Sequence, residues 1–106
     1  MAWMFLLAAG LLEIVWAYTM KLSQGFTRPV PAVVTISVML ASFGLLSLSM
    51  KTLPLGTAYT VWTGIGAVGA FVVGALVLGE PLTTGRVLAA ALIVAGVSLM
   101  KLTASA

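Results

Sequence analysis

The chain has 106 residues, of which 62% are hydrophobic and only seven are charged, whereas a soluble domain devotes about a quarter of its residues to charge, so this composition is typical of a protein whose solvent is lipid. The five cations are scattered singly along the chain, which excludes a basic patch for nucleic acid. The absence of Cys and His excludes disulfides, thiolate or imidazole metal sites and histidine-based catalysis, so we predict neither an enzyme nor a cofactor.

The first predicted span covers residues 2–20, an apolar run of 19 residues with Glu13 inside it. At 1.5 Å per residue a helix of this length covers about 28 Å, close to the roughly 30 Å hydrocarbon core of a bilayer. The run lacks a basic flank and carries a carboxylate in its middle. We therefore interpret it as a membrane span of the mature chain and not as a signal peptide.

Three further spans are predicted over residues 30–50, 55–78 and 84–102, separated by short connections that contain prolines. The fourth covers only about 21 Å between Arg86 and Lys101, and it crosses the membrane if both cations reach toward the headgroups. Glycines recur from Gly64 to Gly79, a pattern that permits either close helix packing or a hinge. We expect residues 1–106 to form one all-α transmembrane domain of four helices.

The cations do not favour one orientation in the membrane. The side of the membrane that holds the N-terminus would carry two cations, Lys51 and Lys101. The opposite side would carry three, Lys21, Arg28 and Arg86. Basic residues are retained on the cytoplasmic side, and a difference of one scarcely biases insertion. We therefore expect chains in both orientations and an antiparallel dimer. Ala89 and Gly96 form a small-residue seam suited to its helix contact, although alanine facing lipid gives the same pattern.

Glu13 is the acidic residue that lies inside a predicted span. A charge at the centre of a membrane helix costs roughly 2.5 to 3.5 kcal/mol on insertion scales, which favours a functional role. Burial disfavours the charged form, and a cation entering the same cavity would stabilise the carboxylate and displace its proton. Such competition is the minimum requirement of antiport, and an organic cation is the expected partner. The alternative is a protonated Glu13 that only hydrogen-bonds a neighbouring helix.

Small, polar and aromatic residues are predicted on the helix faces around Glu13. The candidates for the lining of a cation site are Gly10, Trp16, Met39, Ser42, Tyr59 and Trp62. Aromatic rings offer cation–π faces, and hydroxyl and indole N–H groups can hydrogen-bond the carboxylate. Each candidate also has a structural alternative, because membrane Trp and Tyr are common at the interface and a membrane Ser commonly bonds its own helix.

The chain resembles the small multidrug resistance family over essentially its whole length. The resemblance is carried by three segments, GLLEIVWA from Gly10, KLSQGFTRP from Lys21 and PLGTAYTVWTGIG from Pro54. It implies a transporter of the bacterial inner membrane that acts as an antiparallel, dual-topology homodimer. In such a dimer the two copies of Glu13 would share one site that faces each side of the membrane in turn.

Within this family the chain is similar to the guanidinium exporters. The residues that match this subtype are Trp16, Ala17, Met39, Ala67 and Lys101. The resemblance implies that Glu13 binds guanidinium and protons alternately. It also implies that the two carboxylates are fixed by Trp16, Ser42, Tyr59 and Trp62. The dimer contact would be formed by Ala89 and Gly96.

We therefore predict a proton-coupled antiporter that exports guanidinium and substituted guanidinium compounds. Guanidinium carries N–H donors in its plane and can pair with a carboxylate through parallel hydrogen bonds. The expected partners are this cation, protons, membrane lipid and a second copy of the chain. One alternative is a broad exporter of quaternary ammonium and other multidrug cations. The other is a non-transporting subunit of a membrane assembly that uses Glu13 for packing.

Overall fold

The computed structural model describes residues 1–104 and contains four α-helices, each long and apolar enough to cross a membrane. The helices are α1 (Ala2–Leu22), α2 (Pro29–Ser49), α3 (Leu55–Leu76) and α4 (Thr84–Thr103). Helices of this length measure about 30 to 33 Å, the thickness of the hydrocarbon core. The prediction of an all-α membrane protein with four spans is confirmed, and every helix end lies within two residues of the expected position.

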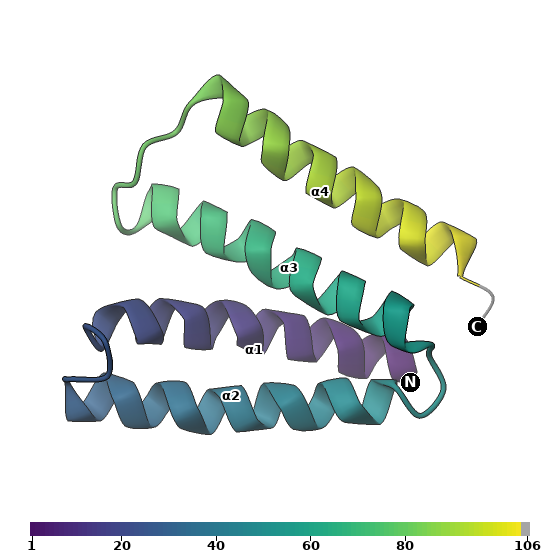
Figure 1. The fold of residues 1–106 in the computed structure, drawn as a ribbon, viewed down its shortest axis with the longest axis horizontal. Helices are drawn as coiled ribbons and strands as arrows, with labels where there is room; N and C mark the ends of the chain where they lie inside the picture. The colour runs from purple at the N-terminus through teal and green to yellow at the C-terminus, as the bar shows by residue number, and fades with distance from the viewer. Residues whose placement is uncertain (105–106) are drawn as a thin grey trace.

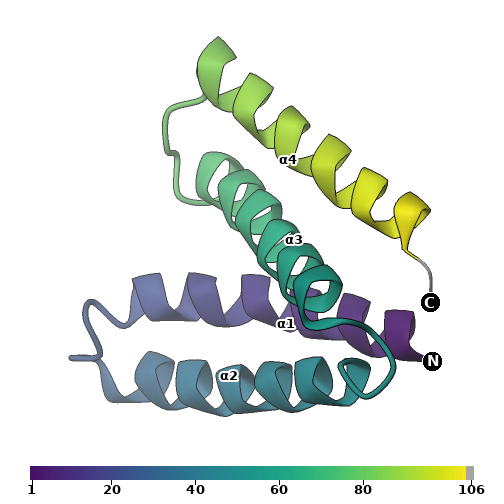
Figure 2. The ribbon, with the colours of Figure 1, turned by 45° about the vertical axis from the view of Figure 1, so that its right-hand side comes forward.

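The four helices pack in an open arrangement (Figure 1). Helices α1 and α2 lie side by side and antiparallel, α3 lies across α1, and α4 forms the outer edge. Among the described helices, α4 approaches only the backbone of α3. Figure 2 shows α4 lying apart from the α1–α2 pair. The N-terminus, the end of α4 and the α2–α3 loop lie at one end of the molecule, opposite the other two loops (Figure 1).

The buried core is small and lies between α1, α2 and the first half of α3. Its apolar members are Leu6, Ala9, Leu46, Leu53, Ala58, Val61 and Trp62. None of the described residues of α4 is buried. Large apolar side chains instead cover the outside of the helices. A surface of this kind fits contact with lipid or with another chain, because a soluble monomer rarely exposes so large an apolar area.

Glycines of α3 allow its neighbours to approach closely. A methyl group at Gly64 would overlap Val97 of α4, and one at Gly69 would overlap Ile14 of α1. The helix is continuous from Leu55 to Leu76 in this conformation. The glycines therefore serve close packing here, one of the two uses that their spacing allowed.

Side-chain hydrogen bonds fix two of the helix ends. After α1, the Ser23 hydroxyl donates to the Met20 carbonyl at 2.6 Å and accepts from the Phe26 N–H at 3.0 Å. Before α4, the Thr83 hydroxyl accepts from the Arg86 N–H at 3.2 Å. This N-cap satisfies a backbone donor of the first turn, which explains why α4 begins ahead of Arg86 and reaches a spanning length.

Candidate functional site

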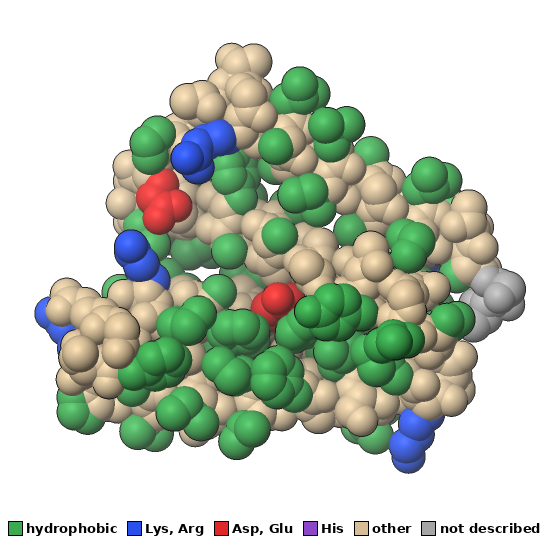
Figure 3. Space-filling model, in the orientation of Figure 1, with side chains coloured by type: hydrophobic (Ala, Val, Ile, Leu, Met, Phe, Trp, Pro, Cys, Tyr) green, Lys and Arg blue, Asp and Glu red, His purple; other side chains and the backbone are tan. Residues whose placement is uncertain are grey.

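Glu13 lies in the middle of α1 and points its carboxylate toward α3. Even a methyl group at Gly66 would overlap this carboxylate, so the glycine creates the space that the acid occupies. The Oε1 atom of Glu13 is buried and has no hydrogen-bond partner among residues 1–104. On the face shown in Figure 3, hydrophobic side chains cover much of the middle of the molecule, while Lys and Arg lie toward its ends. A polar atom in such surroundings gains strongly from any donor or cation that reaches it.

Ser42 joins three helices through two hydrogen bonds. Its hydroxyl donates to the Ala9 carbonyl of α1 at 2.7 Å and accepts from the indole N–H of Trp62 of α3 at 3.1 Å. Ser42 is fully buried and Trp62 is 7% exposed. Within the described residues neither side chain bonds Glu13 in this conformation. Their predicted role in fixing the carboxylate stays a prediction, and the observed bonds show what orients Trp62.

Four aromatic rings from α1, α2 and α3 form a row beside the acid. Tyr59 and Trp62 lie 5.6 Å apart between ring centroids, and Phe43 meets Trp62 at 5.8 Å and Trp16 at 6.3 Å, both edge to face. Such geometries are the favourable ones for aromatic pairs. Phe43 was absent from the sequence-based candidates, although it follows Met39 by four residues and so shares its face of α2. The row presents several ring faces on which a cation can rest.

The other predicted lining residues lie in different environments. The indole N–H of Trp16 is buried without a partner among the described residues, and Met39 is half-buried on α2. Gly10 is covered by Ile65 of α3. It therefore lets α3 approach α1 in this conformation and does not open space beside Glu13. Whether these residues line a cation site stays a prediction.

Ala89 and Gly96 both lie on the exposed surface of α4. A methyl group at Gly96 would meet no atom within 4 Å in the described part of the chain. This small-residue face is therefore free to receive another helix, and its predicted use as the dimer contact stays a prediction.

The chemistry of the site is limited to one carboxylate, aromatic faces and a few hydroxyl and indole groups. Among residues 1–104 no group of three or more His, Cys, Asp or Glu gathers to hold a metal ion. The five cations of the chain lie at the helix ends. The arrangement therefore suits a small organic cation that is paired with a carboxylate and covered by rings.

Known proteins are similar to this chain along nearly its full length. A family model described as Small Multidrug Resistance protein matches residues 1–94. The guanidinium exporter of Salmonella typhimurium (strain LT2) is 55% identical over 104 residues, which covers 98% of this chain and 99% of that protein. The guanidinium exporter of Citrobacter freundii is 55% identical over 102 residues, covering 96% and 97% of the two chains. That of Proteus vulgaris is 53% identical over 102 residues, covering 96% and 98%.

Proposed function

The chain belongs to the small multidrug resistance family, and on this premise we propose that it exports guanidinium in exchange for protons. Its four apolar helices and its family make it a multi-pass transporter of small cations in the bacterial inner membrane. The observation that carries the proposal is the Glu13 carboxylate, which lies against Gly66 of α3 with its buried Oε1 unpaired within the described residues. The names of the relatives supply the cargo.

Glu13 can couple the two ions because it holds one of them at a time. A protonated carboxyl has no charge with which to hold a cation, and a carboxylate paired with a cation resists protonation. If the site turns from one side of the membrane to the other only when occupied, each cation that leaves is replaced by protons that enter. The inward proton gradient then drives export.

Guanidinium fits the groups around Glu13. Its N–H donors lie in one plane and can form two parallel hydrogen bonds with a carboxylate. Its flat faces can stack on aromatic rings of the row, in which Phe43 and Tyr59 are exposed and neighbouring ring centroids lie 5.6 to 6.3 Å apart. A substituted guanidinium with one apolar arm would keep the paired hydrogen bonds and extend the arm between helices. A quaternary ammonium lacks such donors and relies on charge and ring faces.

We further propose that the working unit is an antiparallel homodimer. Three features of the single chain support a second copy: the exposed small-residue face of α4, the unpaired polar atoms of Glu13 and Trp16 within the described residues, and the near-balanced cations of the two membrane faces. In such a dimer both Glu13 carboxylates would serve one site. The two chains would hold different conformations, and an exchange of these conformations would expose the site to the other side of the membrane.

Transport by purified protein in sealed vesicles tests the proposal. A guanidinium gradient should drive proton movement in the opposite direction with the unmodified protein, and Glu13→Gln should abolish it because the amide neither releases a proton nor carries charge. Glu80→Gln is the matched control, since Glu80 lies beyond the end of α3, and it should keep transport. Proton movement driven by tetraphenylphosphonium but not by guanidinium would indicate a quaternary ammonium exporter instead.

Binding measured over a pH series separates coupling from simple cation binding. Acidification should weaken guanidinium binding by about tenfold per pH unit for each proton that the cation displaces, because the two ions compete for Glu13. This pH dependence should vanish in Glu13→Gln. If it survives in that variant, Glu13 is not the exchange site.

A further inference from the structure

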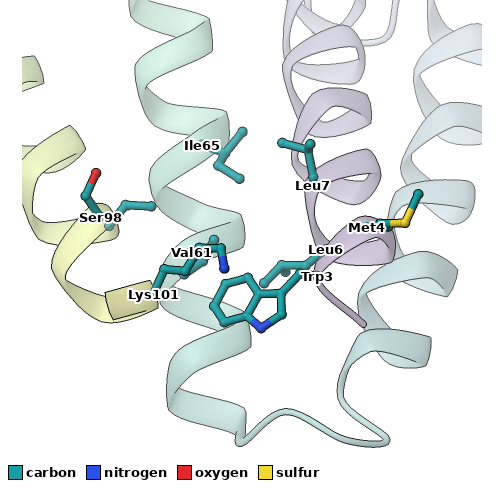
Figure 4. A pocket seen from close by; sticks show the side chains of 9 residues that line it. Trp3, Met4, Leu6, Leu7, Val61, Ile65, Ser98 and Lys101 are labelled. Atoms are coloured by element: carbon teal, nitrogen blue, oxygen red, sulfur yellow. The ribbon is translucent and has the colours of Figure 1, made fainter. Parts of the chain in front are cut away.

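An apolar groove runs between α1, α3 and α4, away from the aromatic row. Its outer part is a cavity of about 340 Å³. Figure 4 shows the side chains that line it, which include Trp3 and Leu7 of α1, Val61 and Ile65 of α3, and Ser98 and Lys101 of α4. Apart from the Ser98 hydroxyl and the polar groups at the Trp3–Lys101 end, these walls are apolar.

The groove continues inward to the middle of the helices. A second cavity of about 310 Å³ shares Ile65 and Ser98 with the first and reaches Ile14 and Gly69. Ile14 lies eleven positions after Trp3 on α1, so the groove spans a rise of about 16 Å, half of the roughly 30 Å hydrocarbon core. Its depth is therefore that of one leaflet.

The outer end of the groove carries a positive charge. The Lys101 ammonium lies 4.5 Å from the centre of the Trp3 ring, in the last turn of α4. The two side-chain carboxylates of the protein lie elsewhere, against Gly66 and Gly74, so neither neutralises this lysine. Trp and Lys at a helix end mark the level of the lipid headgroups.

We propose that this groove binds an anionic phospholipid, with one acyl chain between α1, α3 and α4 and the phosphate paired with Lys101. A leaflet-deep hydrocarbon slot with a cation at its headgroup end is complementary to such a lipid in shape and in charge. This binding site is independent of the proposed transport function. Among the described helices, α4 packs its backbone only against α3. A lipid in the groove would therefore also connect α4 to α1.

The groove and the proposed helix contact use different faces of α4. Val94, Ser98 and Lys101 follow one another at intervals of four and three and therefore share a face, which lines the groove. Gly96 lies two residues from Val94 and from Ser98, so it projects elsewhere. A second copy packed on the small-residue face would leave the groove to lipid.

Native mass spectrometry of the detergent-purified protein tests the site. The protein is mixed with phosphatidylglycerol or phosphatidylcholine of identical acyl chains, and retained lipid is measured for each. We expect phosphatidylglycerol to be retained about fivefold better, the effect of one cation beside an anionic headgroup. Lys101→Gln should remove this preference and Lys101→Arg should keep it. Lys51→Gln is the matched control at the same membrane face and should also keep it.

Filling the groove tests the acyl-chain part separately. Ser98→Trp should reduce retention of both lipids, because the indole occupies the slot, while circular dichroism reports unchanged helix content. Equal retention of the two lipids by the unmodified protein would overturn the proposal. So would an equal loss of preference in Lys51→Gln and Lys101→Gln, or undiminished lipid retention by a folded Ser98→Trp variant.

Discussion

Gly66 sets the room available to the Glu13 carboxylate. Because a methyl group at this position would overlap the acid, Gly66→Ala should push the carboxylate out of its place and reduce guanidinium transport in vesicles at least tenfold. Gly56→Ala is the control on the same helix, since a methyl group there meets no atom within 4 Å in the described chain. Equal transport by the two variants would show that the position of the Glu13 carboxylate against α3 does not matter for exchange.

The Ser42 hydroxyl accepts the hydrogen bond that the buried indole N–H of Trp62 donates. Ser42→Ala leaves the buried Trp62 N–H unpaired, which costs about 1 to 3 kcal/mol, so the variant should unfold at lower denaturant concentration in detergent. Ser47→Ala removes an exposed serine of the same helix and should leave the midpoint unchanged. A Ser42→Ala protein as stable as the Ser47→Ala protein would contradict the importance of the bonds to Ala9 and Trp62.

At the scale of the helices, the sequence predicts most of the architecture because lipid imposes a simple length rule. Each apolar block had to supply about 20 residues to cross the hydrocarbon core, and prolines and charges marked where each block ends. The apolar stretch of α4 is short. The helix nevertheless covers 20 residues, from the Thr83 N-cap to a last turn that contains Lys101. This length agrees with the expectation that the cations at its ends reach toward the headgroups.

The contacts between helices were less predictable than the helices themselves. Sequence spacing shows which residues share a face, and it identified Trp62 and Ser42 as members of one region. It could not show that these two bond each other and the Ala9 carbonyl, because that depends on how three helices are rotated. Phe43 was missed although its spacing from Met39 places it on the same face of α2. Spacing also could not show that Ile65 of α3 covers Gly10.

The small-residue face of α4 offers a prediction about assembly. Ala89→Leu should convert dimers to monomers, because the larger side chain separates helices that need close approach. Ala91→Leu adds the same atoms two residues away, on another exposed face of α4, and should leave dimers intact. Light scattering in detergent and energy transfer between labelled chains in vesicles measure the difference. Intact dimers in Ala89→Leu would place the helix contact elsewhere.

At the scale of the whole molecule, residues 1–104 of one chain do not enclose a pathway. Its core lies between α1, α2 and part of α3, and none of the described residues of α4 is buried. Tyr59, at one end of the aromatic row, is 53% exposed. Among the surfaces left open are the one beside the acid and the small-residue face of α4. A second copy that covers both would exclude lipid from the site and complete the ring of helices around Glu13.

The balance of cations predicts that chains insert both ways. The protein has no native cysteine, so a single Gln24→Cys in the exposed α1–α2 loop reports orientation without background. Impermeant thiol reagents should label it from both sides of the membrane in about equal amounts.

Added lysines should fix the orientation of the chain. Thr52→Lys together with Leu102→Lys should hold the N-terminal face in the cytoplasm and abolish transport, because antiparallel pairs no longer form. Co-expression with a chain carrying Thr27→Lys and Thr84→Lys, biased the opposite way, should restore transport. Full activity of the first biased chain alone would mean that parallel chains suffice, and the near-balanced charge would then have no role in assembly.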